Sequence, residues 1–347
     1  MSELDPERGA APVPPVVTDP TPGLSDASPA TSDVPVAAPP AEALPLFASR
    51  KLAIDVDGAT WLSGLTFSSV GEGVLIIGDA SPIFGVLSGL PLGDNWGHCR
   101  VASGEWTVNG ASVVAGGHRA VCNASPATMV WSGGFTVTEW LAWASRLRGR
   151  SRWTTTRHAR SLLAGLDLHA LGRRRLFELS PLERRLAQIA LAVVDDSPVM
   201  AVEAPFDDLD ERSTDAVWSV LGVAAAGRRV ILTASPRASF SAVRQLAEEA
   251  SDVVVLYGGR CLYAGPSADI FDRPRVYGVT LADEEGGVGA VIDALHEVGI
   301  ELRGGPRVYL AVCPGGASAT DIVLAAHRAA IVVHGCEPLW GRALTGP

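Results

Sequence analysis

The sequence predicts an α/β fold with a smaller α+β unit after it. Short strand-like runs separated by glycine turns begin at residue 46, and a helical spacing of apolar residues replaces them between residues 136 and 195. A strand, a helix and a second strand then follow, an order that favours parallel, buried strands. The 347 residues, 47% of them hydrophobic and 19% charged, suffice for two folded units.

The first 45 residues are expected to form a disordered, acidic tail. They hold eleven prolines and seven Asp or Glu against one Arg. Such a segment buries too little apolar surface to offset the entropy of ordering it. The tail carries most of the net charge of −10, so the rest of the chain is only mildly acidic.

The runs KLAIDVDG, LSGLTFSSV and GVLIIGD predict strands, and GEWTVNGASVV and RAVCN continue them. We expect an antiparallel β region that surrounds a glycine turn in the stretch IIGDASPIFGVLSGL. That stretch has the strand, turn and buried helix of a phosphate-binding loop, G-x-x-x-x-G-K-[ST], without the lysine. Lys51 is the only lysine of the chain. Either Gly78 to Ser81 is a plain strand-to-helix turn, or it is the remnant of a nucleotide site.

The helical insert, about residues 136–195, is predicted from the runs TVTEWLAWASRLRG, RHARSLLAGLDL and SPLERRLAQIALAVV. The strands SPVMAVEAP and GRRVILTAS follow, joined by the helix ERSTDAVWSVLGVAAA, and DVVVLYGGRCLYAG predicts a hairpin. Residues 273–347 then show a β-α-β-β-α-β order, the pattern of a ferredoxin-like domain.

Composition argues against several classes of function. We expect no nucleic-acid partner, because an acidic chain lacks the basic stripe that neutralises phosphates. The five cysteines form no C-x-x-C pair, so neither a zinc site nor a disulfide framework is expected. No apolar run is long enough to span a membrane and no signal peptide is recognised, so we expect a cytoplasmic protein.

Taken in order, these pieces resemble the nucleotide-binding subunit of an ATP-binding-cassette (ABC) transporter. The likeness covers the glycine turn, the insert, the segment LSPLERRLAQIALAVVDDSPVMAVEAPFDDLD and the hairpin. It implies a P-loop NTPase-like cassette over residues 46–272. Residues 273–347, ending EPLWGRALTG, resemble the accessory domain of drug-exporter cassettes, whose permeases are separate chains.

The resemblance implies remnants of a nucleotide site. Gly78 belongs to the former loop and Ser81 stands where the family has its magnesium-binding hydroxyl, but the four residues that include the lysine are missing. Glu203 stands at the magnesium-associated position. Ser180 keeps the serine of the signature L-S-G-G-Q, and Asp210, with Leu209, matches the loop that contacts the opposite cassette.

Other family positions are lost. Pro181 and Leu182 replace the signature glycines, so one N–H is missing and close backbone approach is blocked. Ala204 replaces the catalytic glutamate and cannot act on water. Ser235 replaces the switch histidine, and the segment VCNASPATM, where the glutamine loop falls, has no glutamine.

Some residues keep two interpretations. Glu203 is either a weak magnesium ligand or a strand-end cap or ion-pair partner. Arg184 and Arg185 form an anion site or, as expected for an amphipathic helix, a solvated face. Trp140 and Trp143, three apart on a helix, indicate core packing or contact with a permease helix.

Three functions follow from these expectations. The first is a non-hydrolysing cassette subunit that pairs with itself or with another cassette beneath an exporter-type permease, at the inner face of the plasma membrane. The second is a divergent but active ABC ATPase that would use ATP and Mg²⁺. The third is a stand-alone regulatory module of the same fold. No catalytic residue and no metal site are assigned.

Overall fold

The computed structural model describes residues 44–89, 98–127, 134–235, 237–271, 274–282, 287–304, 308–313 and 317–340. The predicted disordered tail lies outside these residues except for its last two positions. The segment VCNASPATM, residues 121–129, is described only as far as residue 127.

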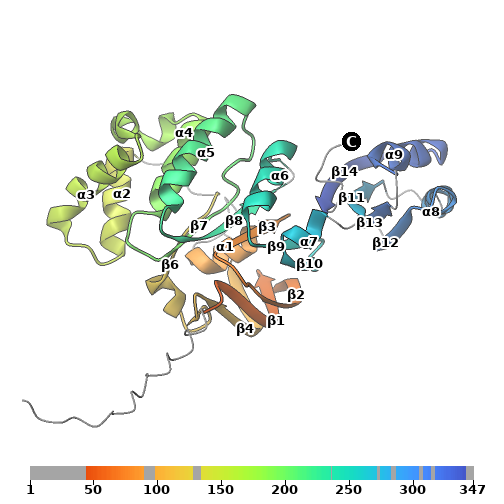
Figure 1. Cartoon of the computed structure of the whole chain (residues 1–347), viewed down its shortest axis with the longest axis horizontal. Coiled ribbons are helices and arrows are strands. Elements are labelled where there is room, and N and C mark those ends of the chain that lie inside the picture. The colour runs from red at the N-terminus through yellow and green to blue at the C-terminus, as the bar shows by residue number, and fades with distance from the viewer. Residues whose placement is uncertain are drawn as a thin grey trace, which may run out of the picture. The chain divides into compact units, whose positions relative to one another are not determined.

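An antiparallel sheet opens the described chain (Figure 1). It contains β1 (Phe47–Val56), β2 (Ala59–Ser68), β4 (Cys99–Val108) and β5 (Ala111–Ser112), in the order β2-β1-β4-β5. Asp57 and Gly58 join β1 to β2 with φ angles of 52° and 83°. Two consecutive positive φ angles are those of a type I′ turn, whose twist matches that of a hairpin.

The core sheet has six strands in the order β10-β9-β3-β8-β7-β6. They are β3 (Gly73–Ile77), β6 (Cys122–Ser125), β7 (Val199–Val202), β8 (Arg229–Ala234), β9 (Asp252–Tyr257) and β10 (Arg260–Pro266). All neighbours pair in parallel except β9 and β10, which form the predicted hairpin. The predicted α/β class with a parallel core sheet is confirmed.

The expectation that the antiparallel region surrounds the glycine turn is corrected by the pairing of β3 and β6. Both strands belong to the parallel core sheet. Their residues are buried on both faces, because alternate side chains of β3 enter two separate hydrophobic cores: Val74 and Ile76 one, Leu75 and Ile77 the other. A short run of apolar residues is typical of such a strand.

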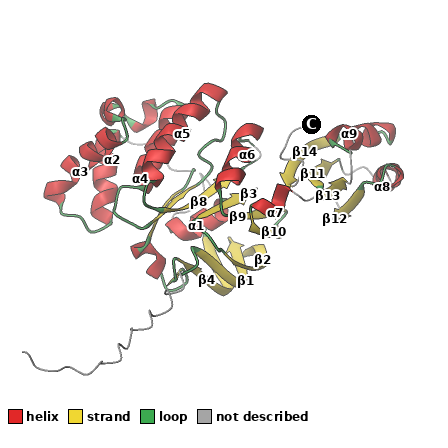
Figure 2. Cartoon of the chain, in the orientation of Figure 1, coloured by secondary structure: helices red, strands yellow, loops and turns green. Residues whose placement is uncertain are grey.

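Helices cover this sheet (Figure 2). They are α1 (Ser81–Ser88), α5 (Glu211–Ala225), α6 (Phe240–Glu249) and α7 (Ala268–Phe271). The sequence prediction omitted α6, although Ser239 caps its first turn by accepting a hydrogen bond from the N–H of Ala242.

The helical insert contains α2 (Val137–Leu147), α3 (Arg152–Gly165) and α4 (Pro181–Ala192). Short 3-10 helices stand at η1 (Gly117–Ala120), before the insert, and at η2 (His169–Arg173) and η3 (Leu176–Glu178) within it. The expected core packing holds for Trp140 but is wrong for Trp143, whose exposed fraction is 46%. The buried face of α2 runs through Val137, Trp140 and Leu141, and Trp143 falls outside it.

The C-terminal elements are β11 (Arg275–Leu281), α8 (Gly287–Glu297), β12 (Glu301–Gly304), β13 (Val308–Cys313), α9 (Ala319–Arg328) and β14 (Val333–Trp340). Their four strands form an antiparallel sheet in the order β12-β13-β11-β14. The boundaries of this unit and its role as an accessory domain stay predictions. Within the described residues, no helix combines the length and apolarity needed to cross a membrane.

Candidate functional site

The glycine turn is short and held by contacts within the protein. β3 ends at Ile77 and α1 begins at Ser81, so only Gly78, Asp79 and Ala80 connect them. The N–H of Gly78 donates to the carbonyl of Ala234 at 2.9 Å. The spacing from Gly78 to Ser81 is four residues shorter than G-x-x-x-x-G-K-[ST] requires, which leaves no room for the arch of N–H groups that surrounds a phosphate.

Two observations explain why residue 78 is a glycine. Its φ is +109°, a conformation that side chains rarely adopt. A Cβ atom there would lie 2.0 Å from the carbonyl oxygen of Leu256 in β9. The chain's one lysine, Lys51, lies exposed in β1 of the antiparallel sheet.

Ser81 and Glu203 meet at the end of the turn. The hydroxyl of Ser81 donates to Oε1 of Glu203 at 2.5 Å. The other carboxyl oxygen, Oε2, accepts from the N–H of Ala127 at 2.7 Å. Each oxygen of Glu203 thus has a partner within the protein, and the Glu203 residue is only 3% exposed.

Burial raises the pKa of Glu203 above the ordinary value of a glutamate. The hydrogen bonds from Ser81 and Ala127 oppose this shift, and Asp79 adds to it. The fold therefore favours the neutral acid more than water does. A carboxylate that binds a metal ion has to be ionised, so this environment disfavours magnesium.

Gln188 supports the same strand end and was not predicted from the sequence. Its side chain is fully buried. Nε2 donates to the backbone carbonyls of Glu203, at 2.7 Å, and of Ser125, at 3.1 Å. Gln188 lies in α4, within the apolar run QIALAVV. A lone polar residue in such a run is the signal that points to a buried hydrogen-bonding role.

The expectation of a solvated face at Arg184 and Arg185 is wrong. Both side chains are partly buried. Nε of Arg184 donates to the carbonyl of Leu179 at 3.1 Å, and Arg185 donates to Oε1 of Gln188 at 3.3 Å. Burial lowers the pKa of Arg185, and Asp207 and Asp208 oppose that shift.

Ser235 bonds to a second buried carboxylate. Its hydroxyl donates to Oδ2 of Asp207 at 2.5 Å, and Asp207 is 1% exposed. Arg237 lies 3.4 Å from the same oxygen, while Oδ1 of Asp207 has no hydrogen-bond partner among the described residues. The sequence analysis missed Asp207, since no motif position marked it.

Ala204 lies between these two carboxylates in the sequence. Its φ is +46°, and its N–H donates to Oγ1 of Thr233 at 2.8 Å. The residue is buried, with 5% exposed. A methyl group at this position offers no acid or base to a reacting water.

The remaining predicted residues act at helix starts. Ser180 caps α4, accepting from the N–H of Glu183 at 3.3 Å, and Pro181 occupies the first turn, followed by the partly buried Leu182. Asp210 caps α5, accepting from the N–H of Ser213 at 2.8 Å. Of the five predicted remnants, the structure joins Ser81 and Glu203 directly, and these bonds of Ser180 and Asp210 serve their own helices.

Comparison with known proteins gives structural matches only. No protein-family model and no curated protein matches the chain. Among solved structures, it matches an "ATP binding subunit of ABC transporter" with a TM-score of 0.49 and 18% identity, over 65% of this chain and 91% of that one. The folded chain is similar to ABC transporter cassettes.

Two further cassettes match with the same TM-score of 0.49. One is a nucleotide-free ATP-binding cassette, at 16% identity over 64% of this chain and 92% of that one. The other is a bacterial Atm1-family ABC exporter with ATP bound, at 20% identity, over 69% of this chain but only 41% of that one.

Proposed function

We propose that this chain is a non-hydrolysing, cassette-like subunit of an ABC transporter. The observation that carries the proposal is the bond between Ser81 and Glu203, at the end of a turn too short to surround a phosphate. The two groups that would hold magnesium are hydrogen-bonded to each other. Three residues link strand and helix, and the lysine of the motif is absent.

The residues present do not fit ATP with magnesium. The N–H of Gly78 is already bonded to Ala234, Pro181 has no N–H, and Glu203 is held in surroundings that favour its neutral form. Ala204 removes the general base, a loss that alone slows a reaction by about a hundredfold to ten-thousandfold. We therefore route no chemical step through this site.

The role proposed instead is structural or regulatory. The subunit would pair with a second cassette, its own copy or an active partner, through the loop at Leu209 and Asp210. It would contact an exporter-type permease through its insert, where Phe135 and Trp143 are 49% and 46% exposed. Exposed aromatic side chains are common in protein interfaces. This places the chain at the cytoplasmic face of the membrane.

A divergent, active ATPase is the second candidate. The observation that favours it is the same pair, because Ser81 and Glu203 keep the register and proximity that a magnesium site needs. Both candidates predict the same partners and differ in turnover.

ATP turnover of the purified chain, together with any chains that copurify with it, separates the two. We expect no turnover above that of a Glu203→Ala variant. Turnover that Glu203→Ala abolishes, and that the exposed control Glu297→Ala leaves intact, would overturn the proposal. Identifying the copurified chains tests the partners, since a permease or a second cassette is expected among them.

A further inference from the structure

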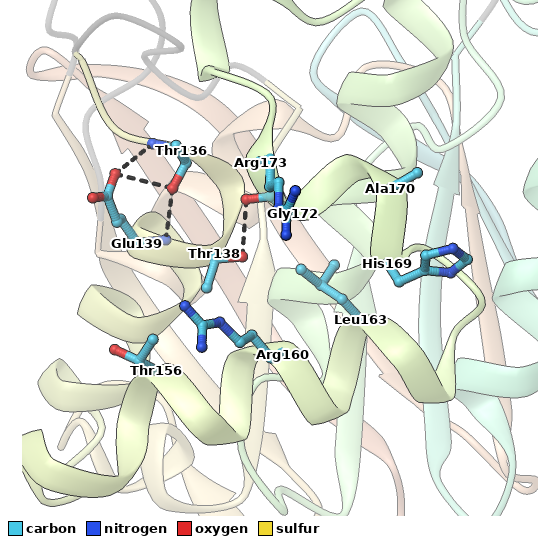
Figure 3. A pocket seen from close by; sticks show the side chains of 10 residues that line it. All are labelled: Thr136, Thr138, Glu139, Thr156, Arg160, Leu163, His169, Ala170, Gly172 and Arg173. Carbon is cyan, nitrogen blue, oxygen red and sulfur yellow. Dashed lines mark hydrogen bonds between the residues drawn. The ribbon is translucent and has the colours of Figure 1, made fainter.

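Two adjoining cavities open on the helical insert, away from the glycine turn. The first, about 1050 Å³, lies between α2, α3 and η2 (Figure 3). The second, about 490 Å³, extends between α2 and the start of α3. Glu139 and Thr156 line both, so the two cavities are continuous. We call them together the insert groove.

Four arginines line the insert groove. Arg160 and Arg173 face the first cavity, and Arg146 and Arg152 the second. All four are exposed, and among the described residues none has a carboxylate within 4.0 Å or a side-chain hydrogen bond. An unpaired guanidinium has five N–H donors in a fixed fork, which match the oxygens of a phosphate.

The one carboxylate of the lining does not neutralise them. Oε2 of Glu139 accepts from the N–H of Thr136 at 2.8 Å and from its hydroxyl at 2.9 Å, so it caps α2. These bonds lower the pKa of Glu139, which is consistent with a carboxylate occupied at the helix start.

The spacing on α3 places the groups on one side of that helix. Arg152, Thr156 and Arg160 follow each other at intervals of four residues, so they form one stripe. Figure 3 shows Arg160 reaching from α3 toward Thr138 of α2, so the stripe faces the opposite wall. Thr136, Thr138 and Thr156 add hydroxyl groups that donate to or accept from a ligand.

Local charge sets this region apart from the rest of the chain. Residues 146–175 hold nine arginines and one acidic residue, Asp167, in a protein of net charge −10. Arg148, Arg150 and Arg174 are paired with Asp195, Asp196 and Glu183. The others are unpaired among the described residues, and their mutual repulsion would be relieved by a bound anion.

We propose that the insert groove is a binding site for a phosphate-bearing anion. Arginines on both sides of the groove donate to its oxygens, and the threonines orient it. The groove is as large as a typical small-molecule site. A free phosphate compound and a phospholipid headgroup share this chemistry, and the measurement below distinguishes them.

The test uses the full chain and inorganic pyrophosphate as the free probe. At low ionic strength, pyrophosphate should raise the melting temperature by several degrees, and calorimetry should show a dissociation constant at least tenfold weaker in the double variant Arg160→Gln, Arg173→Gln. The control Arg260→Gln removes an exposed arginine of the β9–β10 turn and should leave binding unchanged. Without ligand, the double variant should melt no lower than wild type, because it loses only like-charge repulsion.

A second arm uses vesicles of phosphatidylcholine with and without phosphatidic acid, in a sedimentation assay. Arginine-dependent binding to the acidic vesicles without binding of pyrophosphate assigns the site to a lipid headgroup. Equal binding of pyrophosphate to wild type and double variant overturns the proposal. So does binding of polyglutamate, in an arginine-dependent manner, when neither phosphate probe binds, since an acidic protein segment is then the ligand.

Discussion

The hydroxyl of Ser81 and the carboxyl group of Glu203 lie 2.5 Å apart although 122 residues separate them in the sequence. Ser81 begins α1 and Glu203 directly follows β7, so the contact joins the first helix of the core to one of its central strands. The contact makes Glu203 the residue whose substitution is most informative.

We expect Glu203→Gln to keep or increase stability at neutral pH. The pKa of Glu203 in the fold is raised by burial, so its neutral form contributes stability that is present below the ordinary value of 4.5 and is lost as pH rises through the folded pKa. Glutamine does not titrate and can still donate to Ser81 and accept from Ala127. The difference in unfolding free energy, variant minus wild type, should grow with pH above 4.5.

Glu139→Gln gives a control of opposite sign. The pKa of Glu139 is lowered by its bonds to Thr136, so its ionised form adds stability above the unfolded value, and that stability is lost in acid. This variant should lose stability relative to wild type as pH rises. Urea titrations between pH 4 and pH 8 compare the two, and parallel trends would show that Glu203 is ionised.

Magnesium ATP at micromolar concentration should leave the melting temperature unchanged. An intact site at a hundredfold excess over its dissociation constant stabilises by about 2.7 kcal/mol. Because a polyphosphate could also enter the insert groove, the measurement belongs in the Arg160→Gln, Arg173→Gln variant. A shift that persists there and disappears with Glu203→Ala would restore ATP as a ligand of the turn.

Gly78→Ala should destabilise the protein by at least ~2 kcal/mol, from backbone strain and overpacking. The φ of +109° and the carbonyl of Leu256, 2.0 Å from the new Cβ, both oppose the substitution. Gly222→Ala is the matched control, because this glycine lies exposed within α5 with open space around its Cβ position. It should stabilise by about 1 kcal/mol. Equal effects in urea unfolding would contradict the account of the turn.

Ser235→Ala should cost about 1 to 3 kcal/mol of stability, because it removes a hydrogen-bond donor from the buried carboxylate of Asp207. Only Arg237, at 3.4 Å, would remain near that oxygen among the described residues. Ser241→Ala, at an exposed position of α6, should stay within about 0.5 kcal/mol of wild type. Thermal unfolding of both variants provides the measurement.

The periodicity of apolar residues predicted most elements, but not the partners of each strand. β3 and β6 were recognised as strands and assigned to the wrong sheet, because pairing with β8 and with β7 is set by contacts about 80 to 150 residues away. The helix α6 was missed although Ser239 and the apolar residues Val243, Leu246 and Ala247 have the required spacing.

At the site, motif positions identified Ser81 and Glu203 but not their environment. Nothing in the sequence places Ala127 or Gln188 against Glu203, since these contacts depend on the ends of β6 and β7 meeting α4. The arginines of the insert were overlooked for a different reason. The acidic charge of the whole chain concealed a local run of nine arginines in residues 146–175.

Gln188 has a mechanical consequence. Its amide holds the carbonyls at the ends of two neighbouring strands, and both bonds are out of reach of water. Breaking them would leave three polar groups buried without partners, at a cost of about 1 to 3 kcal/mol each. Helix α4 is therefore riveted to the sheet, and a force applied to it passes to the loop that carries Glu203 without slack.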